Sequence, residues 1–135
     1  MSTETVEVVR RAWEAFWLRR DNETALALYD PEVQIDLTAV PHIGQAGTYS
    51  GVEGVQEWIR DLLASFEHMN SAVEEWIDAG DQVIAMIRLY GRGKRSGVSV
   101  DDLQAHLWTV RDGRLSRLQV FATRADALEA AGLSE

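Results

Sequence analysis

The 135-residue chain contains no cysteine and only two prolines. Without cysteine it has no disulfide, no thiolate nucleophile and no cysteine-based metal site. No apolar run approaches the roughly 20 residues that a membrane-spanning helix needs. The N-terminal stretch MSTETVEVVRR has neither the basic nor the apolar region of a signal peptide. We therefore expect a cytoplasmic protein that does not bind or enter a membrane.

Positive charge is also scarce. Lysine and arginine number 13 against 22 acidic residues, so the net charge is -9. Nucleic acids and anionic membranes need a basic face, and neither is expected as a partner. The histidines at positions 42, 68 and 106 lack the spacing of metal ligands on one helix face. We expect neither a metal nor a cofactor.

Hydrophobic residues make up 46% of the chain, which is enough for a sizeable core. The chain has no repeat or linker, so residues 1–135 are expected to form one domain. Apolar residues recur at helical spacing in three places, and alternating or β-branched runs predict strands elsewhere. The expected helices cover residues 3–20, a short segment after Asp21 or Asn22, 52–66 and 124–131. The expected strands cover residues 32–40, 72–79, 82–92 and a long hairpin within 96–122.

The hairpin turns at Asp112-Gly113, because Asp-Gly between apolar runs is a strong turn signal. Strict alternation then separates two faces of its first strand. The polar face, with Asp102, Gln104, His106 and Trp108, resembles a pocket wall. The alternative is that its polar end is solvated and only Trp108 and Val110 are core. The opposite face, Leu103, Ala105 and Leu107, needs a cover, and we expect a homodimer through it.

Helices followed by antiparallel hairpins indicate an α+β fold. The sheet must curl around the N-terminal helices to bury their aromatic stripes. The expected architecture is a cone-shaped, strongly curved and mostly antiparallel sheet, a cystatin-like α+β roll with one open end. Residues 41–47 are a candidate rim of the cone or a plain connection. Ser50 and Glu53 have the spacing of a capping box at the start of a helix.

The chain resembles the SnoaL-like and ketosteroid-isomerase-like group of the nuclear-transport-factor-two-like superfamily. The resemblance covers nearly the whole element order. It also includes local signatures: DPEVQIDL, YSGVEGVQEW, AHLWTVRDGRL and ALEAAGL. These are specific for the fold and not for an activity, because the superfamily holds isomerases, cyclases and non-catalytic binding domains.

The resemblance also implies roles for single positions. Asp36 matches the general base of ketosteroid isomerases, and His106 or Ala105 matches their second oxyanion donor. The tyrosine that serves as their first donor is missing, because Ala12 or Trp13 stands there. Thr123 occupies the place of the catalytic aspartate of SnoaL-like cyclases. Asp36 and His106 are thus the candidate catalytic pair, able to move a proton next to a carbonyl. The alternatives are a surface aspartate and a hydrogen-bonded core histidine.

The expected function is binding of a small, largely apolar organic molecule, with isomerase- or cyclase-type proton transfer through Asp36 and His106. The alternative is a non-catalytic small-molecule-binding domain or a dimeric interaction domain. Tryptophans favour a planar ligand, although those on helices are equally explained as core. Secondary candidates are Asp102, Arg88, Tyr49, His42 and Trp76. The expected pocket residues are Trp13, Trp17, Tyr29, Trp58, Tyr90, Gln104 and Trp108.

Overall fold

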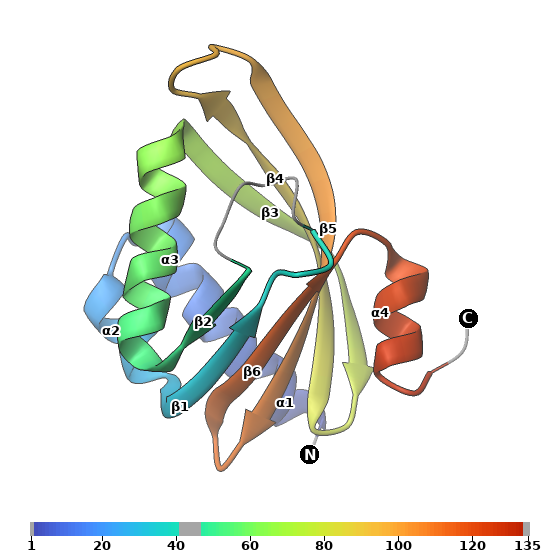
Figure 1. The fold of residues 1–135 in the computed structure, drawn as a ribbon. Coiled ribbons are helices and arrows are strands. Elements are labelled where there is room, and N and C mark those ends of the chain that lie inside the picture. The colour runs from blue at the N-terminus through green and yellow to red at the C-terminus, as the bar shows by residue number, and fades with distance from the viewer. Residues whose placement is uncertain (1, 41–46, 134–135) are drawn as a thin grey trace.

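The structure, a computed structural model, describes residues 2–40 and 47–133. Three helical segments at the N-terminus and one in mid-chain pack against a sheet, and a short helix ends the described chain (Figure 1). The helices are α1 (Ser2–Trp13), η1 (Glu14–Leu18), α2 (Asn22–Ala27), α3 (Gly51–Ser65) and α4 (Arg124–Ala130). The strands are β1 (Tyr29–Asp36), β2 (Thr48–Ser50), β3 (Phe66–Ala79), β4 (Gln82–Gly93), β5 (Ser99–Arg111) and β6 (Arg114–Phe121).

The sheet has six strands in the order β2-β1-β6-β5-β4-β3. Every neighbouring pair is antiparallel except β1 and β6, which run parallel. The sheet is curved, and α1 to α3 lie on one side of it while α4 lies on the other (Figure 1). The α+β fold with a curved, mostly antiparallel sheet over N-terminal helices is confirmed.

Strand ends differ from the prediction for local reasons. β1 begins at Tyr29 and passes through Asp30-Pro31, where its pairing with β6 is irregular. Proline donates no hydrogen bond, so it fits a strand only where the ladder is interrupted. β1 ends at Asp36, whose carboxylate accepts the backbone N–H of Thr38 at 2.9 Å. β3 begins six residues earlier than predicted, because it continues through a bulge at His68.

Two helices begin with a side-chain cap. The Asp21 carboxylate accepts the N–H of Thr24, and the Thr123 hydroxyl accepts the N–H of Asp126. The predicted capping box is wrong: Ser50 makes no side-chain cap and instead donates to the Gln34 amide oxygen at 2.9 Å. The pairing of β1 with β2 places those two side chains opposite each other.

The sheet buries apolar residues on both of its faces. The concave face forms the main core with α1, α2 and α3, and includes Val33, Ile35 and Leu118. On the outer face α4 covers Ala105 and Leu107 through Ala127 and Leu128. From the sequence, a second copy of the chain is expected to cover these residues. Where α4 packs, the apolar face of β5 therefore needs no second copy of the chain as a cover. The homodimer itself stays a prediction.

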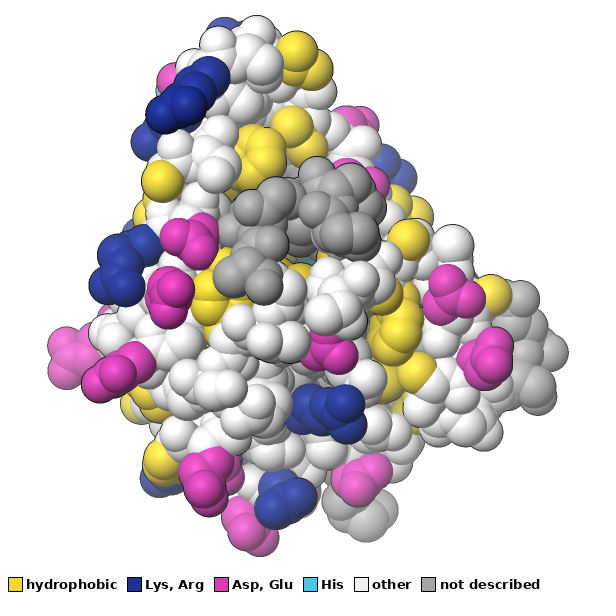
Figure 2. Space-filling view, in the orientation of Figure 1, with side chains coloured by type: hydrophobic (Ala, Val, Ile, Leu, Met, Phe, Trp, Pro, Cys, Tyr) yellow, Lys and Arg dark blue, Asp and Glu magenta, His cyan; other side chains and the backbone are white. Residues whose placement is uncertain are grey.

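On the face shown in Figure 2, acidic and basic side chains are interspersed, and hydrophobic side chains gather beside α3 and beside α4. None of the helices within residues 2–40 and 47–133 is both long and apolar enough to span a bilayer.

Leu118→Ala should lower the free energy of unfolding by about 2–5 kcal/mol, because the side chain is fully buried between β1 and β5 and its loss leaves a cavity. Urea denaturation measures the change. Leu63→Ala is the matched control, because Leu63 is 46% exposed on α3. Equal losses in the two variants would contradict this account of the core.

Candidate functional site

A cavity lies between the concave face of the sheet and α1, η1, α2 and α3. About 80 Å³ of it is open to the centres of water-sized molecules, several times the roughly 10–15 Å³ that one water needs by this measure. The chain has five tryptophans, and all of them line this cavity. They are Trp13, Trp17, Trp58, Trp76 and Trp108. Aromatic rings from five separate elements thus converge on one space.

The helical wall comes from α1 and η1. The N–H of Arg19 donates to the carbonyl of Glu14, five residues back, which makes the last turn a π-helix. Such turns are rare and often occur at functional sites. Phe16 and Trp17 meet edge to face in this turn, with ring centroids 4.9 Å apart. The guanidinium of Arg20 lies over Trp17 and donates to the carbonyl of Met69, so it holds this turn to β3.

The sheet wall comes from alternate residues of β4 and β5. Ala85 pairs with His106, and Ile87 pairs with Gln104, so these side chains point to the same side. Small or apolar neighbours surround the imidazole, since Val120 of β6 flanks it on the other side. His106 is therefore a buried polar group in an apolar wall.

A chain of hydrogen bonds runs along β5 from the half-buried Asp102 to His106. The Gln104 amide nitrogen donates to the Asp102 carboxylate at 3.1 Å, and the Gln104 oxygen lies 3.0 Å from His106 Nε2. A carboxylate only accepts, so it fixes the orientation of the amide. The amide oxygen also only accepts, so His106 carries its proton on Nε2. Nδ1 is left as an acceptor, and no described residue bonds it.

Burial lowers the pKa of His106 to about 4. No Asp, Glu, Lys or Arg is among the described residues that line the cavity. A charged imidazole would there lose its hydration without gaining an adjacent counter-charge. The histidine is therefore neutral at pH 7.

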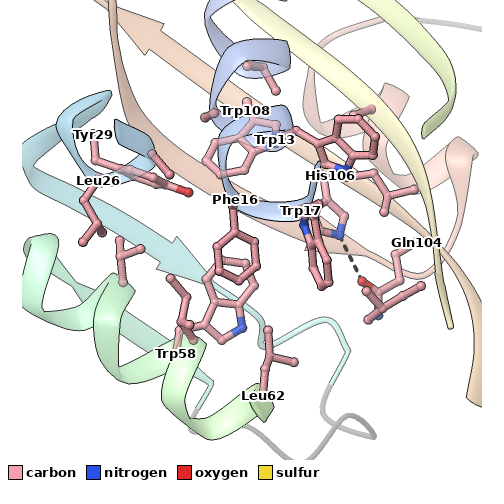
Figure 3. Close-up of a pocket in the computed structure, with 18 of the residues that line it drawn as sticks. Trp13, Phe16, Trp17, Leu26, Tyr29, Trp58, Leu62, Gln104, His106 and Trp108 are labelled. Atoms are coloured by element: carbon pink, nitrogen blue, oxygen red, sulfur yellow. Dashed lines mark hydrogen bonds between the residues drawn. The ribbon is translucent and has the colours of Figure 1, made fainter. Parts of the chain in front are cut away.

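Two further polar atoms belong to the wall. The Trp58 indole nitrogen is buried and has no hydrogen-bond partner among the described residues. In Figure 3 it points away from α3 and towards Trp17. The Tyr29 hydroxyl points into the cavity, and its ring packs edge to face on Trp108 at 6.0 Å. Burial raises the pKa of Tyr29, so its phenol stays protonated.

The structure brings most of the sequence-predicted pocket residues together. Those that line the cavity are Trp13, Trp17, Tyr29, Trp58, Gln104, His106 and Trp108. Sequence reasoning missed Phe16, Leu26 and Leu62 as cavity residues, since a helical stripe looks the same whether it faces packed core or empty space.

Asp36 does not lie in this wall. Ile35 and Leu37 are buried in the core, so alternation turns Asp36 to the opposite side of β1. There its carboxylate accepts from the backbone and the hydroxyl of Thr38, at 2.9 and 2.6 Å. The expected pair of Asp36 with His106 is not formed, and the assignment of Asp36 as a base facing the pocket is corrected.

Tyr90 is also placed outside the cavity. It is 41% exposed, because side chains alternate along β4 and the neighbouring Leu89 points into the cavity. Arg88 shares that outward parity and pairs with Glu74 and Asp101 at the surface.

Two secondary candidates are not part of the cavity wall. Tyr49 is buried and donates to Asp61 at 2.7 Å. Asp102 lies outside the wall and accepts a hydrogen bond from Gln104, which does line the cavity. His42 and all but the last residue of the rim expected at residues 41–47 lie outside the described residues. Within the described part of the chain, no group of three acidic or histidine side chains could hold a metal ion.

Known proteins resemble this chain in sequence and in fold. A family model described as a SnoaL-like domain matches residues 9–118. An uncharacterised protein of Mycobacterium tuberculosis strain H37Rv is 32% identical over 126 residues, which cover 92% of each chain.

Two solved structures share the fold. TerC, co-crystallised with polyporic acid, has a TM-score of 0.77 at 23% identity, covering 96% of this chain and 98% of TerC. A protein with a ketosteroid-isomerase-like fold from Catenulispora acidiphila, in complex with trimethylamine, has a TM-score of 0.71 at 23% identity. That match covers 94% of this chain and 93% of the other.

His106 should make stability depend on pH. Its folded pKa of about 4 is below the usual histidine value of 6.5, so the unfolded chain binds a proton first as pH falls. The stability is complete above pH 6.5 and declines towards pH 4, by up to about 3 kcal/mol. Urea denaturation at pH 7 and pH 4.5 should show a smaller decline for His106→Gln than for wild type. The control is His68→Asn, an exposed histidine, which should behave as wild type. An unchanged decline in His106→Gln would contradict the buried neutral histidine.

Proposed function

Since the chain belongs to the SnoaL-like family, we propose that it binds a small, largely apolar organic molecule in the tryptophan-lined cavity. The observation that carries this proposal is the convergence of all five tryptophans on one space. A close-packed core leaves few voids larger than a water molecule, whereas this one is larger and apolar. An apolar organic molecule would fill it and gain the contacts that its walls lack.

The related structures support the same direction. TerC was co-crystallised with polyporic acid, and the Catenulispora protein was in complex with trimethylamine. Both share the fold at low sequence identity, so they support a bound small molecule in this chain without naming it. The aromatic wall favours ring systems, because offset or edge-to-face stacking adds to the burial of apolar area.

Binding is favoured over proton transfer by the electrostatics of the wall. A general base near neutral pH works best with a pKa close to the working pH, and burial places that of His106 at about 4. The carboxylate expected to act with it, Asp36, faces away and bonds Thr38. His106 therefore serves a ligand primarily as a hydrogen-bond acceptor.

Filling the cavity should abolish binding. Ala12→Leu extends a side chain from α1 into the cavity and is compatible with a helix. With 1-tetralone and 2-naphthol as probes, wild type should show quenching of tryptophan fluorescence and a raised melting temperature. At about 100 times the dissociation constant the gain is about 2.7 kcal/mol. Ala12→Leu should lose both responses. The matched control, Ala64→Leu on the exposed side of α3, should keep them. Equal responses in the two variants would place the bound molecule elsewhere.

Proton transfer is the second candidate, and the unpartnered Nδ1 of His106 is the observation that favours it. In that reaction a C–H bond next to a ligand carbonyl breaks, Nδ1 takes the proton, and the electron pair becomes an enolate. The proton then returns to the same or a conjugated carbon.

Exchange of the α-hydrogens of 1-tetralone in D₂O tests this reaction by NMR. Catalysed exchange that is lost in His106→Gln and kept in His68→Asn would support it. Exchange at the rate of buffer alone, with binding intact, would leave 1-tetralone as a ligand only and count against catalysis on such ketones.

A further inference from the structure

The polar atoms of the cavity select among apolar ligands. We propose that the ligand is a neutral, flat cyclic compound that carries a carbonyl oxygen for Trp58 and a hydroxyl group for His106. The inference rests on the proposed function, because it requires that the cavity bind an organic molecule.

Trp58 contributes a hydrogen-bond donor that has no partner in the described part of the chain. Its indole N–H is buried without a partner among the described residues, and an unsatisfied buried donor is costly. Native structures rarely leave such a group unpaired. An indole N–H only donates, so the group that satisfies it is an acceptor. In an apolar cavity a carbonyl oxygen supplies that acceptor without bringing in a charge.

The second step is the fixed tautomer of His106. Asp102 orients Gln104, and Gln104 accepts from Nε2 of the imidazole. The remaining nitrogen, Nδ1, presents a lone pair on a ring that lines the cavity. Its natural partner is a donor, and a ligand hydroxyl is a neutral one. Tyr29 does not discriminate in this way, because a phenol both donates and accepts.

The third step is the absence of charge. No Asp, Glu, Lys or Arg stands among the described lining residues, so a ligand carboxylate would lose its hydration with no adjacent counter-charge. A cation would interact favourably with the aromatic faces, but it could not accept a hydrogen bond from the Trp58 indole N–H. The wall therefore favours neutral ligands that both accept and donate.

A series of bicyclic compounds of similar shape tests the proposal by isothermal titration calorimetry. Tetralin has no polar group, 1-tetralone adds a carbonyl, 6-hydroxy-1-tetralone adds a hydroxyl, and 1-tetralone-6-carboxylate adds a negative charge. We expect affinity for wild type to rise about three- to tenfold with each of the first two additions. We expect the carboxylate to bind more weakly than 1-tetralone.

Variants separate the two hydrogen bonds. Trp58→Phe should bind tetralin like wild type and lose the gain from the carbonyl, whereas Tyr29→Phe should keep that gain. His106→Phe should lose the gain from the hydroxyl. Asp102 lies outside the cavity and acts as a positioning residue. Asp102→Asn should also reduce the hydroxyl gain, since an amide no longer dictates the orientation of Gln104.

The outcomes are distinguishable from failure of the proposed function. If tetralin and both tetralones fail to bind wild type, the proposed function fails for this ligand class. If all bind with equal affinity, or if the carboxylate or 1-naphthyltrimethylammonium binds best, binding stands and the polar selection is overturned. Loss of the carbonyl gain in Tyr29→Phe but not in Trp58→Phe overturns the role of Trp58.

Discussion

The site depends on the antiparallel pairing of β4 with β5 along nearly their whole length. This register sets Ile87 beside Gln104 and Ala85 beside His106 on the concave side. It sets Met86 beside Ala105 on the outer side, where α4 packs. A slip of one residue would exchange the two faces. The polar chain of β5 would then face α4, and the apolar residues under α4 would face the cavity. Both buried faces resist that slip, so the same packing that stabilises the sheet also holds the imidazole in place.

Much of this arrangement could be predicted from sequence, and the reasons differ between elements. Alternation on β5 identified Gln104, His106 and Trp108 as one face, because a strand has a strict period of two. The same rule applied to β1 sends Asp36 away from Ile35 and Leu37. The resemblance to ketosteroid isomerases favoured a role for Asp36 that local geometry does not support. A family pattern marks a position along the chain, whereas the neighbouring buried residues decide which way its side chain points.

Other features have no signature in the sequence. The pairing of Ser50 with Gln34 across β1 and β2 replaces a predicted cap, because a cross-strand partner competes for the hydroxyl. The π-turn of η1 follows a helical stripe that would look the same in a regular helix. The unpartnered indole of Trp58 is visible only when every neighbour has been placed. These are properties of tertiary packing, so they cannot be predicted from hydrophobic periodicity.

The parallel pairing of β1 with β6 has a consequence for how the chain acquires its structure. β1 joins the main sheet through β6, since its other neighbour, β2, is a short edge strand. Residues 29–36 therefore have no long partner strand until residues 114–121 have been synthesised. During synthesis the aromatic face of the N-terminal helices emerges well before the sheet that buries it can close. Closure of so long a loop carries an entropic cost and slows folding. The sheet that carries one wall of the cavity is thus joined to β1 only after β6 has left the ribosome. Until then the tryptophans of the N-terminal helices are exposed to aggregation or to capture by a chaperone.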